Sequence, residues 1–187
     1  MDGGLAIAKM DAHKAFDSAQ HGAVLASLKY IGCPGWLCSA IVRHHRRGTI
    51  SFTNGNVPTE KIKRSSSIHQ GASTSTLIWR ALAHTAIDCA ENKWDNIEGA
   101  GLEIPGGEGY PPERMMDLRW ADDWFIVART PEALQKMLNV LHGELEDLGL
   151  SLCPDKKDKA SWMCNRWARK EGQQIAIKGK VVHEREA

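Results

Sequence analysis

The sequence has no long apolar run, no internal repeat and no cysteine pair with metal-ligand spacing. Without about 20 consecutive apolar residues, no transmembrane helix is expected. The absence of a regular sequence repeat argues against a repeat or collagen-like protein. The five cysteines are odd in number and contain no Cys-x-x-Cys, which predicts reduced thiols instead of a disulfide framework or zinc site. The first residues, MDGGLAIAKMD, lack the basic region of a signal peptide. We therefore expect an intracellular protein, nuclear or cytoplasmic, without a membrane segment.

The chain has 187 residues, 42% of them hydrophobic and 25% charged, which predicts one globular domain with its own core. Its net charge of +1 conceals a segregation along the sequence. Residues 1–90 carry 10 Lys+Arg and 5 Asp+Glu, residues 91–155 carry 5 and 14, and residues 156–187 carry 9 and 4. An acidic middle between basic flanks is typical of a cation-binding centre beside polyanion-binding surfaces, but an unevenly charged solvated surface gives the same pattern.

The hydrophobic pattern predicts an α+β fold, in the order β-α-α-β-β-α-β-β-α-β-β, with helices packed on one face of a sheet. The predicted strands are Leu5–Met10, Thr49–Thr53, Val57–Lys63, Met115–Trp120 and Trp124–Ala128, followed by two or three short strands among Leu150–Cys153, Lys159–Met163 and Ile175–Val182. The predicted helices are His21–Ile31, Pro34–Arg47, Ser75–Ala90 and Pro131–Leu148. Residues 91–114 are rich in Gly and Pro and show no periodicity, so we predict an inserted surface loop there.

Three carboxylates lie where predicted strands end or turn. Asp11 closes the first strand, and Asp122 and Asp123 occupy the tip of a hairpin with apolar strands. Adjacent carboxylates in such a hairpin repel each other, and a divalent cation removes the repulsion; oxygen-only ligands favour Mg²⁺ or Mn²⁺ over zinc. If the strands are neighbours, Asp11 and Asp122 could hold two ions about 3.5–4 Å apart, as in phosphoryl transfer. The alternative is that Asp-Asp simply forms a good turn.

Four segments resemble, in order and spacing, the palm motifs A to D of reverse transcriptases, most closely those of non-LTR (LINE-type) retrotransposons and group II introns. They are Lys9–Ser18 (KMDAHKAFDS), His69–Ser75 (HQGASTS), Trp120–Asp123 (WADD) and Gly149–Lys157 (GLSLCPDKK). The corresponding family patterns are close to LDFSKAFDS, PQGSPLSP, YADD and GLxLNxxKT. The resemblance implies a polymerase palm over residues 1–187, with motif A at 9–18, motif B at 69–77, the insertion at 91–114, motif C at 119–124 and motif D at 131–157.

The resemblance also implies a metal site. Asp11, Asp122 and Asp123 would bind two Mg²⁺ ions, or Mn²⁺, together with the backbone carbonyl of Ala12. These ions would activate the primer 3′-hydroxyl and assist departure of pyrophosphate. Lys156 matches the motif D lysine, which neutralises or protonates the leaving group; its alternative is an exposed loop lysine.

Three further residues are implied to bind the nucleotide. Phe16 matches the bulky residue that excludes a ribose 2′-hydroxyl, and its alternative is a core aromatic. Gln70 and Gly71 match the motif B loop that lies against the incoming nucleotide and the template. A nucleotidyl cyclase on a similar palm would lack both features, which disfavours that reading.

The implied function is that of an RNA-directed DNA polymerase of a LINE-type retroelement, with an RNA template, a DNA primer and dNTPs as partners and a longer polyprotein around it. The sequence departs from the family at Ser73 and Thr76, which replace prolines, and at Trp120, which replaces a tyrosine. Because few residues precede Asp11, we expect fingers and thumb to be largely missing. These departures keep open an alternative, a truncated inactive remnant or a domesticated nucleic-acid-binding module.

Overall fold

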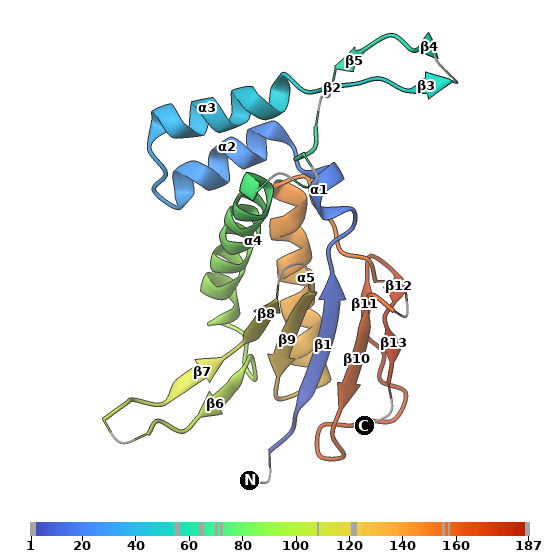
Figure 1. Cartoon of the computed structure of the whole chain (residues 1–187). Helices are drawn as coiled ribbons and strands as arrows, with labels where there is room; N and C mark the ends of the chain where they lie inside the picture. The colour runs from blue at the N-terminus through green and yellow to red at the C-terminus, as the bar shows by residue number, and fades with distance from the viewer. Residues whose placement is uncertain are drawn as a thin grey trace. The chain divides into compact units, whose positions relative to one another are not determined.

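The computed structural model (Figure 1) describes residues 3–54, 57–63, 66–69, 71, 73–107, 109–120, 123–154, 156 and 158–185. The chain divides into two compact units. The sheet unit consists of Met1–His13, Ile87–Asp147 and Ser151–Ala187, and the helical unit of Lys14–Ala86 and Leu148–Leu150. The long helix α4 (Ser73–Trp94) begins in the helical unit and ends in the sheet unit. No helix among the described residues is both long and apolar enough to cross a membrane.

The sheet unit is built on a five-stranded sheet with the strand order β13-β10-β1-β9-β8. The strands are β1 (Ala6–Asp11), β8 (Asp117–Trp120), β9 (Asp123–Ala128), β10 (Ser161–Cys164) and β13 (His183–Glu184). Neighbours are antiparallel except for β13, which runs parallel to β10. The first strand of the sequence is therefore the central strand of the sheet, as a continuous apolar run predicts.

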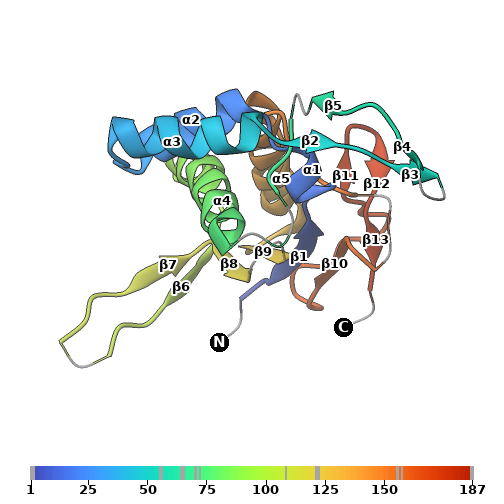
Figure 2. The same ribbon diagram turned by 45° about the horizontal axis from the view of Figure 1, so that its top comes forward.

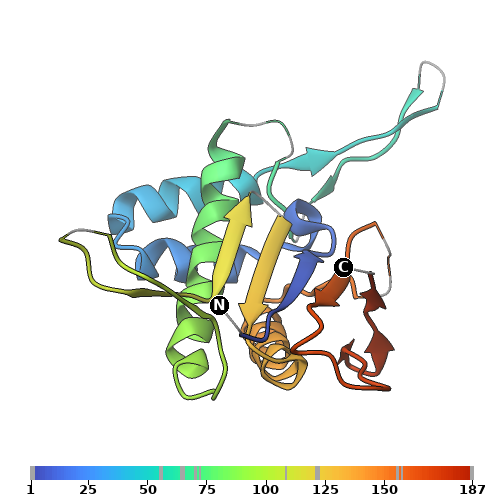
Figure 3. The same ribbon diagram turned by 90° about the horizontal axis from the view of Figure 1, so that it is seen from below.

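One face of this sheet is covered by α5 (Pro131–Asp147), which lies against β9 and β1 (Figure 3). Ala6 and Ala8 of β1 are fully buried, and such small side chains allow a helix to approach closely. The fully buried stripe of α5 consists of Leu134, Met137, Leu138, Leu141 and Leu145. Thr130 caps the helix, because its Oγ1 accepts a 3.2 Å hydrogen bond from the Ala133 amide. The predicted fold class and this helix are both confirmed.

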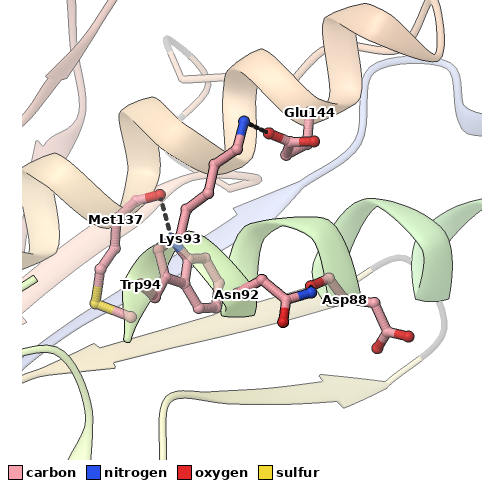
Figure 4. Close-up of polar contacts among 6 residues, drawn as sticks. All are labelled: Asp88, Asn92, Lys93, Trp94, Met137 and Glu144. Atoms are coloured by element: carbon pink, nitrogen blue, oxygen red, sulfur yellow. Dashed lines mark hydrogen bonds and ion pairs between the residues drawn. The ribbon is translucent and has the colours of Figure 1, made fainter. Parts of the chain in front are cut away.

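The end of α4 is tied to α5 within the sheet unit (Figure 4). The fully buried Trp94 donates a 3.0 Å hydrogen bond from Nε1 to the carbonyl of Met137, and Lys93 Nζ lies 2.5 Å from Glu144 Oε1. Asn92 Nδ2 bonds the Asp88 carbonyl one turn back along α4, at 2.7 Å.

Residues 91–114 differ from the predicted irregular loop. The helix continues through Trp94, and β6 (Leu102–Ile104) pairs with β7 (Glu113–Met115) in a hairpin. The helix continues because Trp94 finds a buried partner on α5, which short-range periodicity does not reveal. The prediction of a structureless loop here was wrong.

The C-terminal part of the sheet unit follows the sequence pattern with one exception. The predicted strand at residues 175–182 is a small hairpin of β11 (Ala176–Ile177) and β12 (Lys180–Val181), with Gly179 between the two strands. The predicted strand Leu150–Cys153 is wrong, because it forms only a single bridge between Leu152 and Ala12.

The helical unit contains α1 (Ala15–Ser18), α2 (His21–Tyr30) and α3 (Gly35–Arg46), the last two side by side (Figure 2). A hairpin follows, in which β2 (Thr49–Ile50) pairs with β5 (Ile62–Lys63), and β3 (Thr53–Asn54) with β4 (Val57–Pro58). The predicted strands Thr49–Thr53 and Val57–Lys63 lie in this hairpin, and residues Gly55 and Asn56 lie outside the described residues. The short helix α1 was not predicted.

Candidate active site

The candidate site lies where β1 ends beside the start of β9. Asp11 is the last residue of β1 and pairs in register with Asp123, the first residue of β9. Side chains of directly opposed residues lie on the same face of an antiparallel pair, with Cβ atoms about 4.5–5.5 Å apart. Because Ala8 and Met10 are buried on the face toward α5, alternation places Asp11 on the opposite face. The neighbouring position of the two strands is what a shared carboxylate site requires.

Asp11 is a buried carboxylate with incomplete hydrogen bonding. Asp11 is only 6% exposed, and its Oδ1 has no hydrogen-bond partner among the described residues. Its Oδ2 contacts the ammonium of Lys159, which precedes β10. A buried carboxylate oxygen without a donor is costly unless a cation or a hydrogen bond compensates it. Asp11 therefore has the environment of a cation ligand.

Asp123 is more open than Asp11 and has its own lysine partner. Its Oδ1 lies 3.0 Å from Nζ of Lys9, which sits two residues before Asp11 on the same face of β1. Trp120, the partner of Asp123 across the hairpin, is 81% exposed and leaves an aromatic surface beside the carboxylates. Asp122, the first acid of the predicted pair, lies outside the described residues.

The backbone after Asp11 is held by the segment that follows α5. The Cys153 amide donates to the Asp11 carbonyl at 3.0 Å, and the His13 amide donates to the Ser151 carbonyl at 2.7 Å. These two bonds flank the bridge between Ala12 and Leu152, and neither uses the carbonyl of Ala12. The predicted carbonyl ligand therefore lies on a backbone fixed on both sides of it.

Lys156, the predicted motif D lysine, is exposed. Its carbonyl accepts hydrogen bonds from the amides of Lys159 and Ala160, at 2.9 and 2.7 Å, so it anchors the turn before β10. Sequence reasoning did not single out Lys159 or Lys9. The lysine that contacts Asp11 is thus three residues beyond the predicted one.

The predicted nucleotide-binding residues belong to the helical unit. Phe16 on α1 is half-buried, and its ring centroid lies 6.1 Å from that of Trp79. Gly71 is exposed with a φ of +84°, a conformation that L side chains rarely adopt, so the turn itself explains the glycine. Gln70 lies outside the described residues. The start of α4 near this loop is stabilised by Ser75, whose hydroxyl donates to the His69 carbonyl at 2.5 Å.

A second set of charged side chains joins β8, the strand that leads to the predicted carboxylate pair, to α4. Arg119 Nε lies 2.7 Å from Asp117 Oδ2, and an Arg119 amino group lies 3.8 Å from Glu91 Oε1 on α4. Burial, a hydrogen bond to Asp117 and the charge of Asp117 raise the pKa of Glu91 from 4.5 to about 7. Asp88 adds to this rise, and Arg119 partly offsets it. The contact between the Glu91 carboxyl and Asp117 on β8 therefore depends on whether Glu91 is protonated, and that changes near neutral pH.

Within the described region, Asp11 and Asp123 supply two of the three carboxylates that the predicted divalent-cation site would use. Asp11 Oδ1 is an orphaned buried oxygen, and Asp123 supplies a second carboxylate on the same face. Hard oxygen donors of this kind suit Mg²⁺ and Mn²⁺. Among the described residues, no group of three His, Cys, Asp or Glu side chains could hold a metal ion. The third carboxylate of the predicted set would be Asp122.

Comparisons with known proteins identify the family. Residues 2–176 match the family described as reverse transcriptase (RNA-dependent DNA polymerase). The chain is 26% identical over 153 residues to the Retrovirus-related Pol polyprotein from type-1 retrotransposable element R2 of Nasonia vitripennis, and the alignment covers 82% of the chain and 14% of the polyprotein. The chain thus spans a small part of that relative. The match itself agrees with the predicted resemblance to retrotransposon enzymes.

Solved telomerase structures share the fold. The apo telomerase of Candida tropicalis, truncated from its C-terminal domain, superposes with a TM-score of 0.63 at 14% identity, covering 95% of this chain and 33% of the telomerase chain. A Candida albicans telomerase, in complex with a fragment of telomeric RNA, gives 0.57 at 17% identity, covering 92% and 29%. Because the family match extends over nearly the whole sequence, and the fold agrees with it, the chain belongs to the reverse transcriptase family.

Proposed function

We propose that this chain is the catalytic palm of an RNA-directed DNA polymerase from a LINE-type retroelement, which adds deoxynucleotides to a primer 3′-hydroxyl on an RNA template. The observation that carries the proposal is the pairing of Asp11 with Asp123 on one face of neighbouring strands, with a buried, unpartnered oxygen on Asp11. Family membership supports the same chemistry. Since the chain spans only 14% of its retrotransposon relative, this activity would belong to a longer protein.

In this proposal Asp11, Asp122 and Asp123 hold two Mg²⁺ ions, or Mn²⁺, with the Ala12 carbonyl as a further ligand. When bound, the ions would lower the pKa of the primer hydroxyl and neutralise charge on the phosphates. The protein contributes position, because the paired strands β1 and β9 hold the carboxylates at a fixed separation. The exposed ring of Trp120 offers a stacking surface for the base at the primer end.

The remaining predicted residues act on the nucleotide. Phe16 would exclude a ribose 2′-hydroxyl, and Gln70 and Gly71 would lie against the base and the template. Lys156 is exposed, which leaves its ammonium available to neutralise or protonate the pyrophosphate as it leaves.

Primer extension tests the proposal. The chain is expressed with its natural flanking sequence, and incorporation of dNTPs on a primed RNA template is measured with Mg²⁺. Asp11→Asn and Asp122→Asn should each lower incorporation by at least about 100-fold, because each removes an anionic ligand. Asp147→Asn, at the exposed end of α5, is the matched control and should retain the wild-type rate.

The alternative, an inactive remnant or a nucleic-acid-binding module, makes the opposite prediction for the same assay. It predicts no incorporation by the wild type, or equal incorporation by the wild type and Asp122→Asn. Retained binding of primed RNA without incorporation would favour the binding module.

A further inference from the structure

The Lys159 ammonium contacts the carboxylate that the proposed site needs for its metal. It touches Oδ2 of Asp11, while Oδ1 of the same carboxylate is buried without a hydrogen-bond partner among the described residues. The negative charge of Asp11 is therefore compensated by a side-chain cation on one oxygen only. A divalent cation that binds Asp11 would meet this ammonium at the same carboxylate.

The backbone of Lys159 is fixed, and its side chain is partly exposed. The amide of Lys159 donates to the Lys156 carbonyl, and Ser161, two residues later, pairs with Lys9 in the sheet. The side chain of Lys159 is nevertheless 40% exposed, so part of it faces water. A lysine has a flexible four-carbon stem, and rotation of that stem moves its ammonium by several ångströms without any change in the backbone.

We propose that Lys159 is a built-in counter-ion that occupies Asp11 before a divalent cation binds and leaves Asp11 when the cation arrives. The inference rests on the proposed function, since it takes Asp11 as a metal ligand. The ammonium and the metal compete for one carboxylate, so Lys159 lowers the affinity of the site for the metal and keeps the buried charge of Asp11 compensated without it.

The second lysine of the site differs from Lys159. Lys9 lies within β1 and pairs with Asp123, whose side chain is 42% exposed. A carboxylate that open keeps much of its hydration, and water screens its ion pair. Exchange between ammonium and metal is therefore a property of the buried Asp11, and the test concerns Lys159.

Binding of Mn²⁺ to the chain with its natural flanking sequence, without nucleotide or primer, tests the inference. Free Mn²⁺ is measured by electron paramagnetic resonance for the wild type and Lys159→Met. Removing the competing ammonium should tighten Mn²⁺ binding about tenfold, the size expected for a charge-assisted hydrogen bond at a partly exposed site. Lys136→Met removes a charge from an exposed position of α5 and should change the affinity by less than about twofold.

Asp11→Asn separates failure of the inference from failure of the proposed function. If the wild type binds no Mn²⁺, or Asp11→Asn binds it equally well, the proposed metal site is wrong. If Asp11→Asn abolishes binding but Lys159→Met binds no more tightly than the wild type, the site stands and the counter-ion role is overturned.

Two measurements guard against a variant that fails to fold. Lys159→Gln keeps a polar side chain of similar shape and should also tighten Mn²⁺ binding, with folding checked by circular dichroism. In the wild type, acetylation of Lys159 by an amine-reactive reagent should rise when Mn²⁺ saturates the site, while that of Lys136, exposed on α5, stays constant. Unchanged acetylation of Lys159 would overturn the inference without any substitution.

Discussion

Replacing Glu91 by Gln should stabilise the protein more at pH 8 than at pH 5. The pKa of Glu91 is raised from 4.5 to about 7 by burial and by its contact with Asp117. The folded protein therefore holds a proton on Glu91 that the unfolded chain releases between about pH 4.5 and 7. Stability falls as the pH rises through this window, because the folded state binds more protons. Above pH 7 the Glu91 carboxyl is charged in the folded wild type, so the free-energy cost of burying this charge beside Asp117 applies in full.

The size of the effect follows from the pKa difference and the exposure of Glu91. At about 1.4 kcal/mol for each pKa unit, the rise to about 7 corresponds to at most about 3.5 kcal/mol. The Glu91 side chain is 34% exposed, so solvent screening reduces this to about 1–2 kcal/mol. Gln keeps an amide donor for Asp117 and removes the titration.

Urea unfolding, followed by tryptophan fluorescence at pH 5 and pH 8, measures the difference. The stabilisation by Glu91→Gln should be larger at pH 8 than at pH 5 by about 1–2 kcal/mol. Glu113→Gln, at an exposed position of β7, is the control and should have nearly the same effect at both pH values. A Glu91→Gln variant with no greater advantage at pH 8 would refute the reasoning.

Three further substitutions test the packing of the sheet unit. Trp94→Phe removes the hydrogen bond to the Met137 carbonyl and should lower the free energy of unfolding by about 2–3 kcal/mol, measured in urea. Gly101→Ala should cost about 2–3 kcal/mol in the same assay, because Gly101 has a φ of +70° and an added Cβ would lie 2.7 Å from a Met116 side-chain atom. Lys93→Met should leave the unfolding temperature nearly unchanged in calorimetry, because the Lys93 side chain is 62% exposed and its ion pair with Glu144 is screened by water; a clear fall in the unfolding temperature would contradict this.

Elements with strong local signals were predicted well from the sequence. The helix α5 has a capping threonine, a proline at its first position and one apolar stripe, and all three features agree with the same element. β1 was found from its apolar run, and the hairpin of β8 and β9 from the two acids at its turn. In each case the local signal and the tertiary packing point to the same structure.

Features that depend on tertiary partners were missed. The last turn of α4 is helical because Trp94 packs against α5, and no periodicity within residues 91–94 indicates it. The pairing of Lys159 with Asp11 depends on the register of β10 against β1, which short-range pattern does not supply. Of the seven tryptophans, four are buried and three are exposed. The buried ones are Trp79, Trp94, Trp124 and Trp162, and the exposed ones are Trp36, Trp120 and Trp167.

The candidate site was predictable in outline and not in its electrostatics. Motif spacing drew attention to Asp11 and the hairpin acids, and β1 and β9 are indeed neighbours. The two lysines that compensate these acids, Lys9 and Lys159, carry no motif signal of their own. Counter-ions of this kind become visible only once the strands are paired.

Anomalous diffraction from crystals soaked in Mn²⁺ tests the central claim most directly. The account predicts a Mn²⁺ peak within about 2.5 Å of Asp11 Oδ1 and of a carboxylate of the hairpin. The contrary result would be saturating Mn²⁺ with no peak at Asp11, or a peak elsewhere on the chain while Asp11 keeps Lys159 as its partner.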